Sequence, residues 1–274
     1  MSLGASDGRA AIAATTAAMI VVAFAGAVRA EPACGTAGGE PVWVERVVRG
    51  DEMVLVDGRR LRFATAEAPR PGLAAGEAVR REAEAAGRAA REALADLVEG
   101  RELAFTEAGL DRHGRRLGHL YDIDGGQWIE ARLVAAGHLR VFPTREVRDC
   151  AAALLVAEGE ARAARRGIWA TASFAVVPAR AADLAGRLGE RLVVEGRVTS
   201  VGRSSGRVWL NFGDDFRRDF AVVMDDKDLD RFRAAGFDAP AARGRLLRVR
   251  GVLVHRGGPR MVLDVPEDVE HVTR

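Results

Sequence analysis

Residues 47–70 read VVRGDEMVLVDGRRLRFATAEAPR. Apolar and polar residues alternate on both sides of Asp57-Gly58, a pattern that predicts two half-buried strands joined by a hairpin turn. Asp-Gly is typical of a two-residue type I′ turn, because both central residues of that turn need a positive φ. With the turn at this position, Asp51 and Glu67 lie at the same end of the hairpin and Arg62 projects from it. Two carboxylates and a guanidinium at one sheet edge suit a divalent cation and a phosphate, although carboxylates beside turns are more often simply solvated.

A second motif follows at residues 111–121, which read DRHGRRLGHLY. The two stretches together resemble the staphylococcal-nuclease-like (thermonuclease) family. That family's pattern is Asp-Gly-Asp-Thr, an Arg on the second hairpin strand, Asp-Ala/Thr-Pro-Glu, and then Asp-Arg/Lys-Tyr-Gly-Arg. The resemblance runs from Val42 to Trp169. It implies an OB-type five-stranded barrel flanked by helices, and a calcium-dependent nuclease that acts on DNA or RNA.

The resemblance also assigns the site residues. It implies that Asp51 and Glu67 bind a calcium ion (Ca2+) with help from the backbone carbonyl of Ala68. Calcium tolerates mixed carboxylates in loose geometry, so a Glu at the second position is acceptable. Arg62 and Arg115 match the two family arginines, whose forked donors suit a phosphodiester and its developing charge. The alternative is that one of these arginines forms a structural ion pair with Asp51 or Glu67.

The loop of the second motif carries two further candidates. His113 occupies the position where the family usually has Tyr, and it either stacks on a nucleotide or is an ordinary exposed loop histidine. Gly114 is expected to form the tight turn that presents Arg115.

The chain departs from the family pattern at several positions. Arg70 stands where the family has the Glu that acts as general base, and losing a positioned base costs about 10²–10⁴ in rate. The long side chain of Arg70 could swing outward, and Glu77 could substitute as the base. Arg49 and Glu52 replace the first Asp and the Thr of the first motif. Strand alternation places Glu52 on the opposite face from Asp51, and therefore on the surface.

Residues 1–30 have the pattern of a signal peptide. Arg9 ends a short polar region, residues 10–28 are uncharged and apolar, and Val28-Arg29-Ala30 supplies small residues before a cleavage site. An uncleaved anchor is the alternative, because the apolar run approaches the roughly 18–20 residues that span a bilayer. Its Ala- and Thr-rich composition favours cleavage. We therefore expect an exported protein, periplasmic or secreted, with no stable membrane span after processing.

Export changes the expectation for the two cysteines, Cys34 and Cys150. In an oxidising compartment an isolated pair of cysteines predicts a disulfide, and two unrelated thiols are the alternative. The sequence contains no Cys/His cluster with zinc-ligand spacing.

The formal net charge of +2 over 274 residues excludes a bulk basic surface of the kind that marks many nucleic-acid-binding proteins. Phosphate binding must then depend on individually placed arginines. Lys227 is the only lysine, so the abundance of arginine is partly compositional.

The pattern of elements predicts a mainly β protein with helices (α+β). Residues 31–175 are expected to form the OB-type barrel with its packed helices. Beyond the hairpin, this domain is predicted to contain helices at 76–99, 128–136 and 146–166, and strands at 101–106 and 116–123. Residues 170–188 are interpreted as a linker or a bridging segment.

Residues 185–274 predict a second, small OB-like β-barrel. Five short runs with alternating or continuous apolar residues predict strands at 191–201, 207–212, 220–224, 245–254 and 261–265. A helix is predicted at 229–235, before the fourth strand. Modules of this topology often bind oligonucleotides or oligosaccharides, but a fold alone does not establish a function.

Three functions are compatible with these observations. The first is an exported nuclease-like protein that hydrolyses or binds nucleic-acid phosphodiesters. The second is a catalytically inactive tandem-OB module that binds nucleic acid or another anionic ligand in the cell envelope. The third is an envelope interaction module without a nucleic-acid role. Arg70 is the residue that separates the first from the second.

Overall fold

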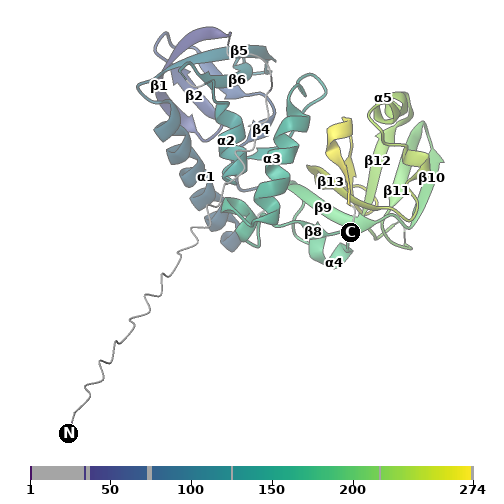
Figure 1. Cartoon of the computed structure of the whole chain (residues 1–274). Helices are drawn as coiled ribbons and strands as arrows, with labels where there is room; N and C mark the ends of the chain where they lie inside the picture. Colours follow the sequence, from purple (N-terminus) through teal and green to yellow (C-terminus); the bar gives the residue numbers. More distant parts are fainter. Residues whose placement is uncertain (2–33, 35–37, 73–75, 125, 216, 273–274) are drawn as a thin grey trace. The chain divides into compact units, whose positions relative to one another are not determined.

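The computed structural model describes residues 1, 34, 38–72, 76–124, 126–215 and 217–272. The predicted signal peptide lies outside these residues except for Met1. No helix within them is both long enough and apolar enough to cross a bilayer. The two β-rich parts are coloured from blue to teal and from green to yellow in Figure 1.

A closed five-stranded barrel forms the first part, with strand order β1-β2-β3-β6-β5. Its strands are β1 (Glu40–Arg49), β2 (Glu52–Leu55), β3 (Arg60–Phe63), β5 (Glu102–Leu110) and β6 (Arg116–Asp122). Only β3 and β6 pair in parallel, and the other neighbours are antiparallel. This is the OB-type architecture that the sequence predicts.

The hairpin turn between β2 and β3 differs from the prediction. Only Gly58 has a positive φ, of 84°, while Asp57 does not. Gly58 N donates to Leu55 O at 2.9 Å, and Leu55 N donates to Arg59 O at 2.9 Å. The connection is therefore a three-residue loop with its last residue left-handed, and the prediction of a type I′ turn is wrong.

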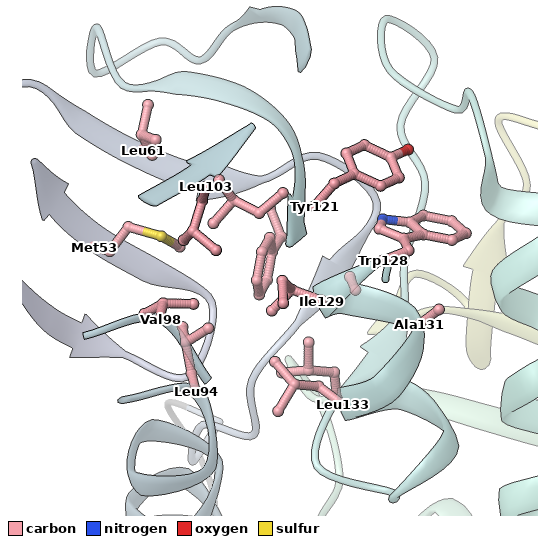
Figure 2. Close-up of a cluster of buried hydrophobic side chains, with 14 of the residues drawn as sticks. Met53, Leu61, Leu94, Val98, Leu103, Tyr121, Trp128, Ile129, Ala131 and Leu133 are labelled. Carbon is pink, nitrogen blue, oxygen red and sulfur yellow. The ribbon is translucent and has the colours of Figure 1, made fainter. Parts of the chain in front are cut away.

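Three helices pack beside the barrel strands: α1 (Glu77–Val98), α2 (Ile129–Ala135) and α3 (Ala151–Ala163). The buried residues of α1 are Ala83, Ala90, Leu94 and Val98, which recur at spacings of seven and four residues and so share one face. Figure 2 shows Leu94 and Val98 close to Met53 and Leu103 of the barrel, with residues of α2 completing the same core.

Helix α3 begins five residues later than predicted, at Ala151 instead of Glu146. Cys150 precedes it with a φ of 69°, in the left-handed region that interrupts a helix. Cys34 and Cys150 form the predicted disulfide, which ties the segment before β1 to the start of α3.

The strands of the second part form two sheets. One has the order β10 (Ser200–Ser204), β11 (Arg207–Asn211), β12 (Ala221–Asp225), β15 (Pro259–Val262), β14 (Val254–His255). The other has the order β16 (Val269–His271), β13 (Leu246–Val252), β9 (Arg191–Arg197), β8 (Val177–Pro178). Helix α5 (Leu229–Ala234) lies between β12 and β13, before the fourth long strand as predicted.

The two sheets share strands through short interruptions of the chain. Only residues 198–199 separate β9 from β10, and only Leu253 separates β13 from β14. When each pair is treated as one bent strand, the order matches that of the first barrel. The parallel pair β12–β15 then corresponds to β3–β6. The second part therefore follows OB-type topology.

The segment 170–188 is a packed bridge. It contains β8 and the short helix α4 (Ala181–Leu184), and Phe174, Val177 and Leu184 are buried. A small cluster joins Phe174 to Ala83 of α1, Ala161 of α3 and Val193 of β9. The remaining short elements are β4 (Ala66–Glu67), β7 (Arg140–Val141), and the 3-10 turns Gly167–Ala170, Asp226–Asp228, Ala239–Ala241 and Pro266–Asp268.

Charged side chains also connect the two parts. Arg250 of β13 is 1% exposed and donates to both oxygens of Glu158 on α3, which is 0% exposed. It donates as well to the carbonyl of Val141 at 2.6 Å and to Glu270. A buried guanidinium with this many acceptors keeps its charge satisfied. Residues Glu31–Arg274 form one compact unit, while separate folding of the two parts stays a prediction.

Candidate functional site

A cleft of about 750 Å³ opens beside the predicted site hairpin. Residues from β3, β4, the loop before β6, β7 and the start of β9 line it. Six arginines and four carboxylates are among them: Arg62, Arg70, Arg112, Arg115, Arg140, Arg191, Glu67, Asp111, Glu146 and Glu190. Positive charge therefore exceeds negative charge in the cleft, which favours an anionic ligand.

The structure brings Asp51, Arg62 and Glu67 together as predicted. Asp51 lies in the turn between β1 and β2 and is 0% exposed. Its Oδ2 accepts from Arg62 Nε at 3.1 Å, and Arg62 Nη2 donates to Glu67 Oε1 at 3.1 Å. Arg62 therefore forms the ion pair with Asp51 and Glu67 that the sequence analysis gave as the alternative to a phosphate-binding role.

Arg70 points inward in this structure, toward Asp51 and not toward solvent. Its Nη2 donates to Asp51 Oδ2 at 2.8 Å, beside the donor from Arg62. The side chain of Arg70 keeps 38% of its surface exposed, whereas that of Asp51 keeps 1%. A buried carboxylate needs partners of opposite charge, and two guanidinium groups supply them here.

The other possible base, Glu77, does not reach the site. It begins α1 with a side chain that is 82% exposed and paired with Arg81. It is also not among the residues that line the cleft.

These residues, as arranged, do not fit a calcium ion. Calcium takes six to eight oxygen ligands. Asp51 Oδ2 already holds two guanidinium groups, and Glu67 is shared between Arg62 and Arg191, the latter at 3.4 Å. Within the described part of the chain, no three His, Cys, Asp or Glu side chains converge as a metal site. Three positive groups around two carboxylates repel a further divalent cation.

One carboxylate oxygen of these residues accepts no hydrogen bond. Asp51 Oδ1 is buried and has no hydrogen-bond partner among the described residues. Ala68, the predicted source of a carbonyl ligand, follows Glu67 and is also buried. A single unpartnered carboxylate oxygen is far from the coordination shell of calcium.

Arg115 reaches the site through a contact that the sequence did not predict. Its Nη1 donates to Glu52 Oε2 at 2.7 Å, and its Nε donates to Asp111 Oδ2 at 2.7 Å. Glu52 is 2% exposed and also pairs with Arg60, so its predicted surface position is wrong. Alternation fails here because Asp51 lies in a turn and all four residues of β2 are buried.

The loop that carries Arg115 is held by Asp111. Asp111 Oδ1 accepts from His113 N at 2.8 Å and from Arg115 N at 3.0 Å, and Gly114 has a φ of 74°. The glycine thus forms the predicted tight turn, and His113 is exposed at the cleft. Burial opposes both charges, but the ion pair outweighs it: the pKa of Asp111 is lowered and the pKa of Arg115 is raised.

Sequence reasoning missed an arginine–aromatic cluster in the cleft. The guanidinium of Arg140 lies 5.2 Å from the ring of Phe142 and 5.1 Å from that of Phe174, and Arg191 lies 5.2 Å from Phe142. Burial lowers the pKa of Arg140 to about 10, so this residue still carries its charge at neutral pH. No motif marks these residues, and Arg191 comes from beyond the segment that resembles the family.

Comparison with known proteins agrees with this fold. The family described as staphylococcal nuclease homologue matches residues 60–171. A protein named "Uncharacterized endonuclease" from Escherichia coli O157:H7 is 30% identical over 132 residues, which are 47% of this chain and 76% of that protein. A protein of the same name from Escherichia coli matches equally. The chain belongs to the staphylococcal nuclease homologue family. The family match includes Arg62, Glu67 and Arg115 but begins after Asp51.

Proposed function

We propose that this is an exported, nuclease-like protein that binds nucleic-acid phosphodiesters in the arginine-lined cleft and hydrolyses them slowly. The family supports the ligand class. The cleft supports the binding mode, because Arg62, Arg70 and Arg191 converge on Asp51 and Glu67. The signal-peptide pattern of residues 1–30 supports export.

The observation that carries the proposal is this convergence of guanidinium groups at an open cleft. Planar forked donors match two oxygens of a phosphodiester at once. Arg191 is 41% exposed on its side chain, which leaves donors available to a ligand. The buried rings of Phe142 and Phe174 carry the guanidinium groups of Arg140 and Arg191 and so hold these charges at the cleft.

Slow hydrolysis follows from the residues that surround Arg70. The resemblance places a general-base Glu at this position, and the Arg cannot accept a proton. The carboxylates nearby, Asp51, Glu52, Glu67 and Asp111, each hold at least one arginine. We therefore expect cleavage about 10²–10⁴ slower than in a relative with a positioned base.

Calcium-dependent endonuclease activity is the second candidate. Family members are generally calcium-dependent, and the unpartnered Oδ1 of Asp51 gives one specific reason to test the ion. Binding of calcium by Asp51, Glu67 and Ala68 would first require Arg70 to leave Asp51.

The test measures binding and cleavage separately on the mature protein. A fluorescent oligonucleotide reports affinity, and its fragments report hydrolysis, in calcium or in chelator. We expect Arg62→Gln and Arg191→Gln each to weaken binding severalfold in chelator, because each removes a phosphate donor. The matched control is Arg81→Gln, an exposed arginine on α1 outside the cleft. Affinity that is unchanged in both cleft variants would refute the proposal, and full affinity only in calcium would favour the second candidate.

A further inference from the structure

The outer face of the sheet β10-β11-β12-β15-β14 is a second surface with aromatic and basic character. On β11, Val208 and Leu210 are buried in the core, so Arg207 and Trp209 point to the opposite face. On β15, Met261 is buried and Arg260 points outward. We call this surface the Trp209 face; it is defined by Gly202, Arg207, Trp209, Arg256 and Arg260.

Arg207 pairs with Asp225 at 3.3 Å, whereas the other two arginines of the face have no acidic partner among the described residues. The guanidinium of Arg260 lies over the ring of Trp209 at 4.9 Å from the centroid. Partial burial and the nearby charges of Arg256 and Arg207 lower the pKa of Arg260. Within the described residues, neither Arg256 nor Arg260 forms an ion pair. Like charges held together without compensation favour binding of an anion.

Space is available beside the tryptophan. Gly202 on β10 is the cross-strand partner of Trp209, so a side chain at this position would lie on the same face. A Cβ added to Gly202 would meet nothing within 4 Å. Val254 and Val262, 38% and 48% exposed, add apolar surface around Arg260. The space at Gly202 is therefore open, next to a ring that carries the guanidinium of Arg260.

We propose that the Trp209 face is a binding surface for single-stranded nucleic acid, with phosphates on Arg260, Arg256 and Arg207 and a base beside Trp209. A single strand exposes both parts of this pattern, the anionic backbone and the flat apolar bases. A duplex hides its bases, and an anionic polysaccharide has none. The Trp209 face lies outside residues 60–171, which match the family, and it would bind its ligand without the cleft.

Gly202 offers a test that removes no native contact. Its backbone is extended and the space is open, so Gly202→Glu and Gly202→Lys differ mainly in the sign of the charge that they place beside Trp209. Binding of a fluorescein-labelled dT15 oligonucleotide is measured by anisotropy in chelator, in an Arg62→Gln/Arg115→Gln background that weakens the cleft. We expect Glu to weaken binding roughly tenfold relative to Lys, because a carboxylate repels the phosphates.

Three further variants test the individual contacts. Trp209→Leu should weaken binding roughly tenfold, the usual worth of a stacked base. Arg260→Gln should weaken it severalfold and reduce the slope of log affinity against log salt by about one. Arg203→Gln is the control: it lies on β10, faces away from Trp209 and pairs with Asp226 at 2.9 Å, and its affinity should stay that of the parent.

Each outcome decides the question. If the Gly202 pair and Arg260→Gln bind dT15 as the parent does, the proposal is wrong. It is also wrong if duplex DNA or heparin binds as tightly as dT15 and ignores Trp209→Leu, because the face would then be a general polyanion site. If the face variants weaken binding while the Arg62 and Arg115 substitutions have no effect, this surface stands and the cleft proposal fails.

Discussion

At the residue scale, Arg70 decides the chemistry of the cleft. A guanidinium stands where the family resemblance requires a carboxylate, and it turns inward to Asp51. Asp51 therefore holds two arginines through one oxygen, and its charge is compensated by the protein itself. Under the proposed function, this exchange adds a phosphate donor and removes the general base.

Arg70→Glu should restore both the base and room for a cation. We expect calcium-dependent cleavage to rise by roughly two orders of magnitude, the usual contribution of a positioned general base. Adding Arg115→Ala should remove most of that gain, because the transition state loses a donor worth about 3 kcal/mol. The measurement is the initial rate on a labelled oligonucleotide, with Arg81→Glu as control.

The opposite results are equally informative. Efficient cleavage by the wild type, unchanged in Arg70→Glu, would mean that another group is the base. If neither protein cleaves or binds calcium, Arg49 and Glu67 have removed the metal site, and the binding-module function replaces the enzymatic one.

A second prediction at this scale concerns His119, which is buried against Glu130. Burial alone would lower the pKa of His119, but the Glu130 carboxylate outweighs it and raises that pKa above 6.5. The pair therefore stabilises the fold fully below pH 6.5, and this contribution is lost as the pH rises through the raised pKa. NMR titration should show the raised pKa, and urea unfolding should show greater stability at pH 6 than at pH 9. Glu130→Gln should remove this difference; if the difference persists, another group causes it.

At the element scale, the contact between α3 and β13 rests on a buried ion network. Glu158 accepts from Arg250, Arg162 and the backbone N of Val141. Arg250→Met removes the central cation and leaves buried carboxylates undercompensated, so we expect a loss of about 3–5 kcal/mol in the free energy of unfolding. Urea denaturation measures this change. Arg203→Met, at an exposed pair, should change stability by less than about 0.5 kcal/mol, and an equal effect of the two substitutions would contradict the role of the network.

At the scale of the whole molecule, the disulfide and the N-terminal segment allow the predicted export to be tested. The mass of the exported protein should correspond to a chain that begins at Glu31 with no free thiol. The disulfide closes a loop across 116 residues, and Cys34→Ala/Cys150→Ala should cost about 3–5 kcal/mol. Two thiols that react with an alkylating reagent in the native protein would contradict this prediction.

The two β-rich parts have separate hydrophobic cores, one in the barrel and one between the two later sheets. Limited proteolysis should therefore cut between residues 170 and 188 and leave two resistant fragments. Burial of Phe174 and Leu184 should make this cut slow in the wild type, and Arg250→Met should accelerate it by loosening the contact between the parts. A single protected core across the bridge, in both proteins, would show that the two parts fold together.

The sequence alone determined the elements and the near neighbours of the site. Strand and helix periods predict the barrel strands and the packed helices, and the spacing across a hairpin predicts that Asp51, Arg62 and Glu67 meet. These are local relations, fixed by backbone geometry over a few residues. The predicted type I′ turn was wrong because Asp-Gly fits more than one type of hairpin loop.

Only the tertiary structure decided which charges face each other. Arg70 reaches Asp51, Arg115 reaches Glu52 across 63 positions, and Arg140 and Arg191 complete the cleft from distant segments. A long arginine side chain can satisfy its charge in several directions, and its choice depends on which carboxylates the packed barrel leaves buried nearby. No spacing in the sequence encodes that choice, because it is set by the desolvation of groups that become neighbours only when the chain is folded.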